Sequence, residues 1–531
     1  MATLVDVWKA RVAANPEHPA IAYFDGILSA REVDEMSDAF AAALAGKGVG
    51  HGDRVGIHLQ NIPQYAIAFL ALWKLGAAAL VLNPMYRRAE LRHLVDDAGA
   101  VGIICADTAV AENAETMQDS TVRWIVSTSD LDFQTRNDPR VFNDRTRERH
   151  DGADDLVELV ERFRGSKPSV AGITPADTAI LAYTSGTTGP PKGALNSHSN
   201  VLAVATTFAE LARVDDGDVV LAVAPLFHIT GAVINATIAL MKDCTLVFAN
   251  RFAADVTLDA FAEHEVTYTI GSITVFNALY NSPAATADHF ASIKTLYSGG
   301  APIPPAAVEK FENKFGHYIH NAYGMTETSS GVIAVPPDRR APVDPASGAL
   351  SIGMALPQVE IRVVDFDGTP LPDGTQGELE IAGPQVVSGY WQKPEATAKT
   401  FPDGRLRTGD VAIRDADGWI YLVDRLKDQI NVSGYKVWPR EVEDALVAHP
   451  AVGEAGVVGQ PDEYQGESVV AFVSLVRDAE VTEQELRSFV GDRLAAYKRP
   501  KHIHIVDELP KTQTGKIRRT ELRTTEAEAT R

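Results

Sequence analysis

Hydroxyl side chains, glycines and one lysine alternate between residues 183 and 193. The run reads Tyr-Thr-Ser-Gly-Thr-Thr-Gly-Pro-Pro-Lys-Gly. Hydroxyl groups and close-approaching backbone N–H groups bind phosphate oxygens, and a lysine adds positive charge. The run therefore indicates a phosphate-binding loop rather than a plain polar surface loop. The residues assigned to this loop are Thr184, Ser185, Gly186, Thr187, Thr188, Gly189 and Lys192.

The spacing of this loop differs from that of a Walker loop. Lys192 is preceded by Pro191 and followed by Gly193, whereas a Walker loop has glycine before the lysine and serine or threonine after it. The patterns G-x-G-x-x-G, H-E-x-x-H and G-x-S-x-G do not occur in the sequence. The motifs of dinucleotide-binding proteins, zinc proteases and α/β-hydrolases are therefore missing.

Helical patterns alternate with short Val-, Ile- and Ala-rich runs through about the first 420 residues. Such alternation predicts stacked βαβ units with parallel sheets. One example is a buried helix over 65–74 that leads into a core strand over 77–82; a lysine and a glycine divide this apolar stretch, which argues against a membrane span. The Asp- and Arg-rich segment 127–175 interrupts the alternation, and we expect a surface connection with one helix near 156–163.

Two further units are expected toward the C-terminus. Strand-like runs between 355 and 421, separated by Gly, Pro and Asp turns, predict a β-rich subdomain. Beyond Arg425, strand-like and helical patterns continue to about Val506, with Pro439 at a helix start, and fit a small α+β domain. The predicted fold class is α/β: a large N-terminal domain of stacked βαβ sheets with a β-rich subdomain, and a small α+β C-terminal domain.

The chain is acidic, with 49 Lys and Arg against 71 Asp and Glu in 531 residues, a formal net charge of −22. This charge argues against binding to nucleic acid or to an anionic membrane. An anionic ligand then needs a local positive site, and the window 498–519 offers one, with seven basic and two acidic residues. The two cysteines lie in apolar runs and the N-terminus lacks a secretory signal, so we expect a cytoplasmic protein.

The phosphate-loop sequence resembles that of the adenylate-forming superfamily, which includes acyl-CoA synthetases, firefly luciferase and the adenylation domains of peptide synthetases. Further motifs of that superfamily follow in the family order over almost the whole chain. They are Pro-Leu-Phe-His at 225–228, Tyr-Ser-Gly-Gly-Ala-Pro at 297–302, Tyr-Gly-Met-Thr-Glu at 323–327, Thr-Gly-Asp at 408–410, Asp-Arg-Leu-Lys-Asp at 424–428, Asn-Val-Ser-Gly at 431–434 and Pro-Lys-Thr-Gln-Thr-Gly-Lys at 510–516.

The resemblance implies a nucleotide site. Thr326 would contact the α-phosphate and Glu327 would bind Mg²⁺ on the ATP phosphates, which suits the preference of Mg²⁺ for carboxylate and phosphate oxygens. Asp410 would accept hydrogen bonds from the ribose hydroxyls, and Arg425 would make a second ribose contact. Taken alone, Glu327 fits a helix cap and Asp410 a structural turn equally well. The residues implied around adenine are Tyr323, which stacks on the ring, and Gly300, Ala301, Pro302, Asn321, Ala322 and Gly324.

The resemblance also implies the groups at the reaction centre. Lys516 would contact both the substrate carboxylate and the α-phosphate. Lys427 matches a hinge about which a mobile C-terminal domain rotates between two half-reactions, giving domains at 1–425 and 426–531. Gly434 would line the channel for the pantetheine arm of CoA, although a plain turn glycine is the alternative. His228 would form a wall of the acyl pocket, together with Val233, Ile234, Val275, Phe276 and Gly299.

The implied activity is that of an AMP-forming acyl-CoA ligase. Such an enzyme uses ATP, Mg²⁺ and CoA to convert a hydrophobic carboxylic acid, here expected to be a fatty acid, into an acyl-adenylate and then a thioester. Alternatives within the superfamily are loading of a carrier protein, an aryl-acid CoA ligase and a luciferase-like oxygenase. A nucleotide-binding sensor or scaffold without catalysis is the alternative from another class. The expected partners are small molecules, with no nucleic acid and no integral membrane segment, and the oligomeric state stays open, a homodimer included.

Overall fold

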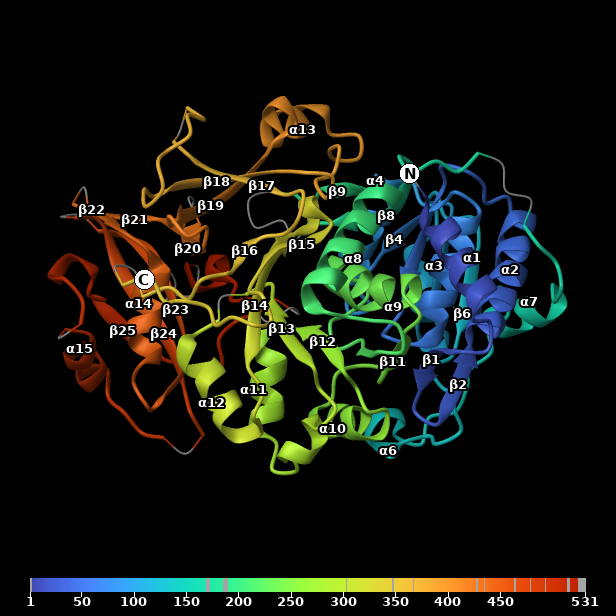
Figure 1. Cartoon of the computed structure of the whole chain (residues 1–531), viewed down its shortest axis with the longest axis horizontal. Helices are drawn as coiled ribbons and strands as arrows, with labels where there is room; N and C mark the ends of the chain where they lie inside the picture. Colours follow the sequence, from blue (N-terminus) through green and yellow to red (C-terminus); the bar gives the residue numbers. More distant parts are fainter. Residues whose placement is uncertain are drawn as a thin grey trace.

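We describe the protein from a computed structural model, shown in Figure 1. The structure describes residues 2–168, 172–184, 190–301, 303–345, 348–365, 367–425, 428–433, 435–462, 465–477, 479–491, 493–512 and 516–523. Two large sheets flanked by helices make up most of the chain, and the C-terminal unit lies at the opposite end of the molecule from the N-terminal helices (Figure 1).

The first large sheet has seven strands in the order β7-β6-β5-β3-β4-β8-β9, all parallel except β9. Its strands are β3 (Arg54–His58), β4 (Ala78–Val81), β5 (Gly102–Ala106), β6 (Ile125–Thr128), β7 (Asp154–Asp155), β8 (Thr178–Tyr183) and β9 (Gly193–Ser197). Its helices are α2 (Ala30–Gly46), α3 (Pro63–Lys74), α4 (Arg88–Ala98), η1 (Asp107–Ala109), α5 (Val110–Thr116), α6 (Pro139–Phe142) and α7 (Leu156–Arg162). The predicted helix over 65–74 is confirmed as α3, which is buried on every side because it is apolar on nearly every side.

The second large sheet has nine strands in the order β16-β15-β14-β13-β12-β10-β11-β1-β2. The six strands from β14 to β1 are parallel, and the strands at both ends are antiparallel. The strands are β1 (Pro19–Tyr23), β2 (Gly26–Ser29), β10 (Val219–Leu221), β11 (Thr245–Phe248), β12 (Tyr268–Gly271), β13 (Thr295–Gly299), β14 (Ile319–Met325), β15 (Ser330–Ala334) and β16 (Met354–Ala355). The associated helices are α1 (Leu4–Ala14), α8 (His198–Ala212), the π-helix η2 (Gly231–Thr237), α9 (Ile238–Met241), α10 (Ala254–Glu263), α11 (Ile273–Asn281), η3 (Ala287–Phe290), α12 (Pro305–Phe315) and η4 (Thr326–Thr328).

A four-stranded antiparallel sheet forms the predicted β-rich subdomain. It contains β17 (Glu360–Val364), β18 (Gly377–Ala382), β19 (Leu406–Arg414) and β20 (Ile420–Arg425), with α13 (Pro394–Thr400) and η5 (Pro402–Gly404) between β18 and β19. The sequence patterns indicated three of these strands; β19 is an addition. Its ladder with β20 places Asp410 directly opposite Arg425.

The C-terminal unit is the predicted α+β structure with a hydrophobic core of its own. Pro439 occupies the first turn of α14, and Val442 and Leu446 from that helix are buried in the core, as the pattern predicted. The elements are β21 (Ile430–Val432), β22 (Tyr435–Val437), α14 (Pro439–Val447), β23 (Val452–Asp462), β24 (Gly466–Leu475), α15 (Glu483–Gly491), η7 (Ala496–Lys498) and β25 (His502–Ile505).

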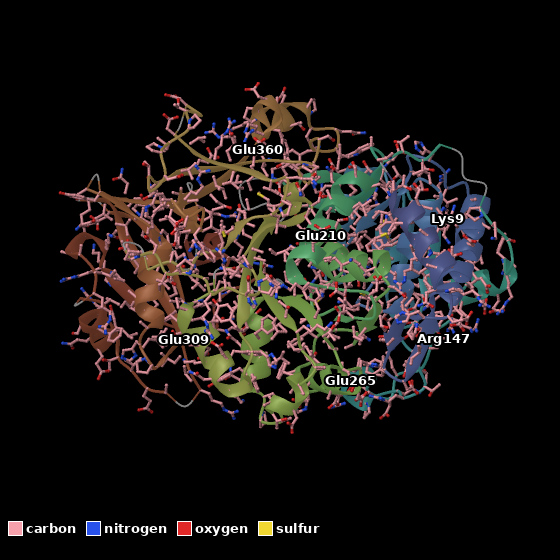
Figure 2. The ribbon with its side chains drawn as sticks, in the orientation of Figure 1. Lys9, Arg147, Glu210, Glu265, Glu309 and Glu360 are labelled. Carbon is pink, nitrogen blue, oxygen red and sulfur yellow. The ribbon has the colours of Figure 1, made fainter. Side chains whose placement is uncertain are left out.

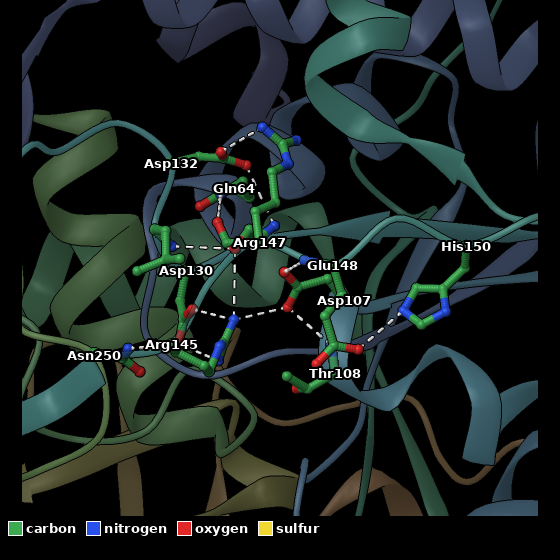
Figure 3. A network of polar contacts seen from close by, with 12 residues as sticks. Gln64, Asp107, Thr108, Asp130, Asp132, Arg145, Arg147, Glu148, His150 and Asn250 are labelled. Atoms are coloured by element: carbon green, nitrogen blue, oxygen red, sulfur yellow. Dashed lines mark hydrogen bonds and ion pairs between the residues drawn. The ribbon is translucent and has the colours of Figure 1, made fainter. Parts of the chain in front are cut away.

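The segment 127–175 is more than the expected surface connection with one helix. It adds the edge strand β7 and the short helix α6, and its charged side chains reach into the sheet edge (Figure 3). Arg145 pairs with Asp107 at 2.8 Å, and Arg147 pairs with Asp132 at 2.8 Å. Asp107 is only 1% exposed, and a buried carboxylate requires a cationic partner. The arginines that make this segment hydrophilic therefore hold it against the core.

Charged side chains cover the exterior of the molecule (Figure 2). Glu210, Glu265, Glu309 and Glu360 are all exposed, and they lie on separate parts of the fold. Within the described ranges, no helix combines the length and the apolar character that crossing a membrane requires.

A buried lysine joins α2 to α3. The side chain of Lys74 is 1% exposed, and its ammonium group donates hydrogen bonds to Asp34 at 2.7 Å, Asp38 at 2.6 Å and Ser37 at 2.8 Å. Two carboxylates around one ammonium stabilise the helix pair as long as all three groups are present.

We expect Lys74→Ala to destabilise the N-terminal part of the chain by about 3–5 kcal/mol, because it leaves buried carboxylates without a cation. The measurement is the midpoint of thermal unfolding followed by calorimetry. Arg164→Ala is the matched control, since Arg164 forms an exposed pair with Glu161 and should leave the midpoint unchanged. Equal midpoints for Lys74→Ala and the wild type would contradict this role.

Candidate functional site

A cavity of about 260 Å³ lies between the second large sheet, the antiparallel sheet and the C-terminal unit. Strands β13 and β14 are parallel neighbours, and ligands of such sheets bind beyond the carboxyl ends of the strands. The cavity therefore collects residues that lie far apart in the sequence. The predicted site residues that line it are Gly300, Ala301, Asn321, Ala322, Tyr323, Gly324, Asp410, Arg425 and Lys516.

The wall formed by β13 and β14 requires small residues. Gly299 pairs with Ala322 across the ladder, and a Cβ atom on Gly299 would lie 2.9 Å from the Ala322 carbonyl oxygen. A Cβ atom on Gly324 would lie 1.8 Å from the Ser330 carbonyl oxygen. Gly300 has a φ of +81° in the left-handed region, which favours glycine. Packing against neighbouring backbone therefore requires glycine at 299 and 324, and the backbone conformation favours it at 300.

Asp410 is the centre of a hydrogen-bonded group at the cavity. It is 6% exposed. The Tyr323 hydroxyl donates to its Oδ2 at 2.7 Å, and Arg425 Nε lies 3.1 Å from its Oδ1. A carboxylate offers about four acceptor positions, so Asp410 keeps acceptor capacity for two more donors. That capacity matches a pair of neighbouring hydroxyl groups such as a ribose diol.

Glu327 lies in η4 and is 7% exposed. Burial raises the pKa of its carboxyl group, and a hydrogen bond donated by the Tyr390 hydroxyl to Oε1 at 2.6 Å opposes that rise. The ammonium group of Lys192 lies 4.9 Å from the centroid of the Tyr390 ring, within the range of a cation–π contact. Tyr390 thus brings together the phosphate-loop lysine and the carboxylate expected to bind Mg²⁺.

Tyr390 was missed by the sequence analysis, although the structure fixes it firmly. The backbone on either side of it pairs with β9: Leu195 N–H donates to the Gly389 carbonyl at 3.1 Å, and Trp391 N–H donates to the Gly193 carbonyl at 2.8 Å. These bonds tie the segment to the strand that follows the phosphate loop. A lone tyrosine after a glycine carries no chemical signal in the sequence, and only the fold reveals its neighbours.

The described residues contain no group of three or more His, Cys, Asp or Glu side chains arranged to hold a metal ion. A cation at Glu327 would therefore take most of its ligands from phosphate oxygens and water. Mg²⁺ in nucleotide sites is bound in this way, through one or two carboxylates and the substrate phosphates. The single buried carboxylate fits that ion.

His228 lies near Lys516, and its tautomer follows from its neighbours. Thr230 N–H donates to His228 Nδ1 at 3.3 Å, so the ring proton is on Nε2. Burial, and to a lesser extent the Lys516 ammonium, lowers the pKa of His228 to about 4. The imidazole is therefore neutral at pH 7 and presents an N–H donor, which suits orientation of a carboxylate rather than proton transfer.

The basic window 498–519 is not the positive surface that its composition indicated. Five of its basic side chains are paired with carboxylates, which neutralise them. The pairs are Lys498–Glu441, Lys501–Asp462, Lys511–Glu454, Arg518–Glu521 and Arg519–Glu443. Lys516 and Arg519 are the basic residues of this window that line the cavity.

Arg519 holds the segment that carries Lys516. Its guanidinium lies 3.3 Å from Asp424, 3.2 Å from Asp428 and 2.8 Å from Glu443. Asp424 is in β20, whereas Glu443 is in α14 of the C-terminal unit. One arginine therefore connects the end of the chain to both sides of the cavity.

The residues assigned to the acyl pocket lie apart from this cavity. Val233 and Ile234 in η2 are fully buried, Phe276 is 1% exposed, and Val275 is half-buried. None of them lines the cavity of about 260 Å³. The cavity is lined on this side by other residues of α11 and its start, namely Ile273, Thr274 and Asn277.

Several assigned residues lie outside the described part of the chain. They are Ser185, Gly186, Thr187, Thr188, Gly189, Pro302, Lys427 and Gly434. Thr184 and Lys192 flank the phosphate loop, and Thr184 N–H donates to the Lys192 carbonyl at 3.0 Å. The two ends of the loop are thus held together at the end of β8.

Comparisons with known proteins agree with this geometry. The family model of the AMP-binding enzyme matches residues 8–391, and that of the AMP-binding enzyme C-terminal domain matches residues 441–516. A long-chain-fatty-acid–CoA ligase of Escherichia coli O6:H1 is 34% identical, covering 98% of this chain and 94% of that protein. The 4-coumarate–CoA ligase 3 of Oryza sativa subsp. japonica is 32% identical, covering 93% and 86%.

Solved structures agree as well. The crystal structure of ATP-bound MatB from Rhodopseudomonas palustris superimposes with a TM-score of 0.87 at 27% identity, covering 99% of this chain and 100% of that one. The predicted fold class and the resemblance are confirmed, and the chain is an AMP-forming acid–thiol ligase that uses ATP, Mg²⁺ and CoA. It belongs to the AMP-binding enzyme family, the adenylate-forming superfamily whose motifs it carries.

Proposed function

We propose that this ligase activates a long-chain fatty acid and transfers the acyl group to CoA. The observation that carries the proposal is the convergence of Lys516 with Tyr323, Asp410 and Arg425 on one cavity. Similarity to a long-chain-fatty-acid–CoA ligase over 98% of the chain supports the substrate class.

The proposed nucleotide site follows from the geometry. Adenine would lie against the glycine-rich wall of β13 and β14, beside Tyr323. The ribose hydroxyls would donate to the free acceptor positions of Asp410, next to Arg425. Lys192 and the hydroxyl loop would bind the β- and γ-phosphates, Thr326 would contact the α-phosphate, and Glu327 would hold Mg²⁺ on the phosphates. Bound Mg²⁺ would supply charge neutralisation for the phosphate oxygens.

In the first half-reaction, a carboxylate oxygen of the acid attacks the α-phosphorus, the bond to the bridging oxygen breaks, and pyrophosphate leaves. Both reactants are anionic, so positioning and charge stabilisation provide most of the catalysis. Lys516 would stabilise charge on the carboxylate and the α-phosphate. His228 Nε2–H would orient the carboxylate by donating a hydrogen bond to it.

In the second half-reaction, the thiol sulfur of CoA attacks the acyl carbonyl and AMP leaves. We propose that the chain is divided at 425 and 426 into a large N-terminal domain and a C-terminal domain, which rotates about Lys427 between the two steps. Gly434 would then line the pantetheine channel.

The free, buried Cys105 and Cys244 support a cytoplasmic location.

The direct test is pyrophosphate release from Mg-ATP with a panel of acids, each with and without CoA. The panel contains short, medium and long aliphatic acids, aromatic acids and an acid with a sterol side chain. We expect turnover with long aliphatic acids that requires CoA. Turnover with aromatic acids alone would indicate an aryl-acid ligase. Pyrophosphate release that does not depend on CoA would indicate carrier-protein loading. No pyrophosphate release with any acid of the panel would indicate a protein that only binds nucleotide.

Lys516→Ala should slow acyl-adenylate formation by about 10²- to 10³-fold, as for removal of one group that stabilises developing charge. Thioester formation from supplied acyl-adenylate should be unaffected, because Lys516 acts in the first step only. Single-turnover assays of each half-reaction measure the two effects. Lys501→Ala is the matched control, since Lys501 pairs with Asp462 and neither residue lines the cavity. Equal losses in both half-reactions would contradict the assigned role.

His228→Ala should lower kcat/KM for the acid by about 10²-fold, the cost of one lost hydrogen-bond donor. The loss should be the same at every pH from 5 to 8. The pKa of His228 is lowered to about 4, so the imidazole is protonated only below this range and loses no proton within it. An inflection near pH 6.5 that is present in the wild type and disappears in the variant would show that His228 titrates during catalysis.

A further inference from the structure

The segment that carries His228 is held by a side chain from the other large sheet. Residues 222–228 connect β10 of the nine-stranded sheet to the π-helix η2. Asn61 lies between β3 and α3 of the seven-stranded sheet and is 4% exposed. Asn61 belongs neither to the phosphate loop nor to any of the other motifs described above.

The Asn61 carboxamide is matched to the backbone of this segment. Its Nδ2 donates to the Ala222 carbonyl at 2.7 Å and to the Ala224 carbonyl at 3.0 Å, and its Oδ1 accepts from Leu226 N–H at 2.8 Å. Both hydrogens of the amide and its oxygen are therefore used. Aspartate or leucine of similar size could not make these three bonds, since neither provides two donors and one acceptor.

The start of η2 packs closely against the same segment. A Cβ atom on Gly231, at the start of η2, would lie 2.2 Å from the Pro225 carbonyl oxygen and 2.5 Å from the Ala224 carbonyl oxygen. The segment is thus held between Asn61 and the backbone of the π-helix. His228 follows directly, and its own N–H donates to the Pro225 carbonyl at 3.0 Å. The position of the imidazole therefore depends on where 222–226 lies.

We propose that Asn61 is a positioning residue for the acid substrate, which acts through the backbone of 222–226 to place His228 Nε2–H at the substrate carboxylate. This inference rests on the proposed function of His228. The contact of Asn61 with 222–226, which joins the two large sheets, would then have a role in binding the acid. This role is separate from the binding of ATP.

The primary test compares Asn61→Ala with the wild type in steady-state kinetics. We expect kcat/KM for the acid to fall by about 10- to 100-fold, since a shift of about 1 Å in a positioned group costs up to about 10²-fold, while KM for ATP changes less than about twofold. Gln64→Ala is the matched control. Gln64 is also a fully buried carboxamide at the start of α3, but it donates to the Ser129 carbonyl at 2.7 Å, away from the cavity (Figure 3). It should lower thermal stability without changing either KM.

A double-mutant cycle separates positioning from a general loss of structure. If Asn61 acts through His228, then Asn61→Ala should have no further effect on kcat/KM for the acid in a His228→Ala background. Additive losses would overturn the proposal, and so would equal increases in KM for the acid and for ATP.

A second measurement does not depend on turnover. Hydrogen–deuterium exchange of the peptide that covers 222–230 should be faster in Asn61→Ala than in the wild type, because the Leu226 amide loses its acceptor. The same peptide in Gln64→Ala should exchange as in the wild type. Unchanged exchange in Asn61→Ala would overturn the proposal even if the chain were inactive with every acid, and inactivity of the wild type would by itself refute only the proposed function.

Asn61→Ser and Gly231→Ala provide further variants in case Asn61→Ala does not fold. Serine retains one donor and one acceptor, and a Cβ atom at position 231 would press on the Pro225 and Ala224 carbonyl oxygens. Both should reduce kcat/KM for the acid more than that for ATP. A loss in Gly231→Ala that falls equally on both substrates would contradict positioning through this segment.

Discussion

A single arginine among three carboxylates holds the segment that carries Lys516 at the cavity. Arg519 contacts Asp424 on the side of the antiparallel sheet and Asp428 and Glu443 on the side of the C-terminal unit. Burial raises the pKa of Glu443, and the Arg519 charge opposes that rise. Buried charges are tolerated only when each has its partner. Because Lys516 lies three residues before Arg519, the position of the lysine in the cavity depends on this cluster.

The cluster also connects the antiparallel sheet and the C-terminal unit, which both line the cavity. Asp424 accepts a hydrogen bond from Arg440 N–H at 2.9 Å in addition to its contact with Arg519. Two groups of the C-terminal unit therefore converge on one carboxylate at the end of β20. The neighbouring Arg425 pairs with Asp410. Successive residues of one strand thus serve the interface between the units and the nucleotide site.

Much of the architecture could be predicted because it follows from local patterns of apolar and polar residues. The all-apolar α3, the strand β4 and the proline at the start of α14 follow from periodicity and helix-start signals. The segment 127–175 was misjudged because its arginines look like surface residues until their buried carboxylate partners are known. The basic window 498–519 was misjudged for the same reason, since the partners that neutralise it lie on other elements.

The residues of the candidate site also fall into two groups: those identifiable from the local sequence, and those identifiable only from their contacts in the fold. Residues in the motifs were identifiable by type and spacing, and nine of them line the cavity. Tyr390 and Asn61 were not, because their importance lies in what they touch: a carboxylate 63 residues away and a backbone segment more than 160 residues away. The assignment of the acyl-pocket residues stays a prediction, since Val233 and Ile234 are fully buried and do not line the cavity.

The pairing of β1 with β11 sets the order in which the chain can complete its fold during synthesis. The strand at 19–23 is made long before its parallel partner at 245–248. Arg11 in α1 likewise donates to the carbonyls of Ala239 and Cys244. During synthesis, α1 and β1 therefore cannot form these contacts until the intervening strands of the seven-stranded sheet have been made. Contacts of such high sequence separation form slowly. Until β11 is made, one edge of the β1–β2 pair stays open, so we expect a nascent chain to need a chaperone at this segment.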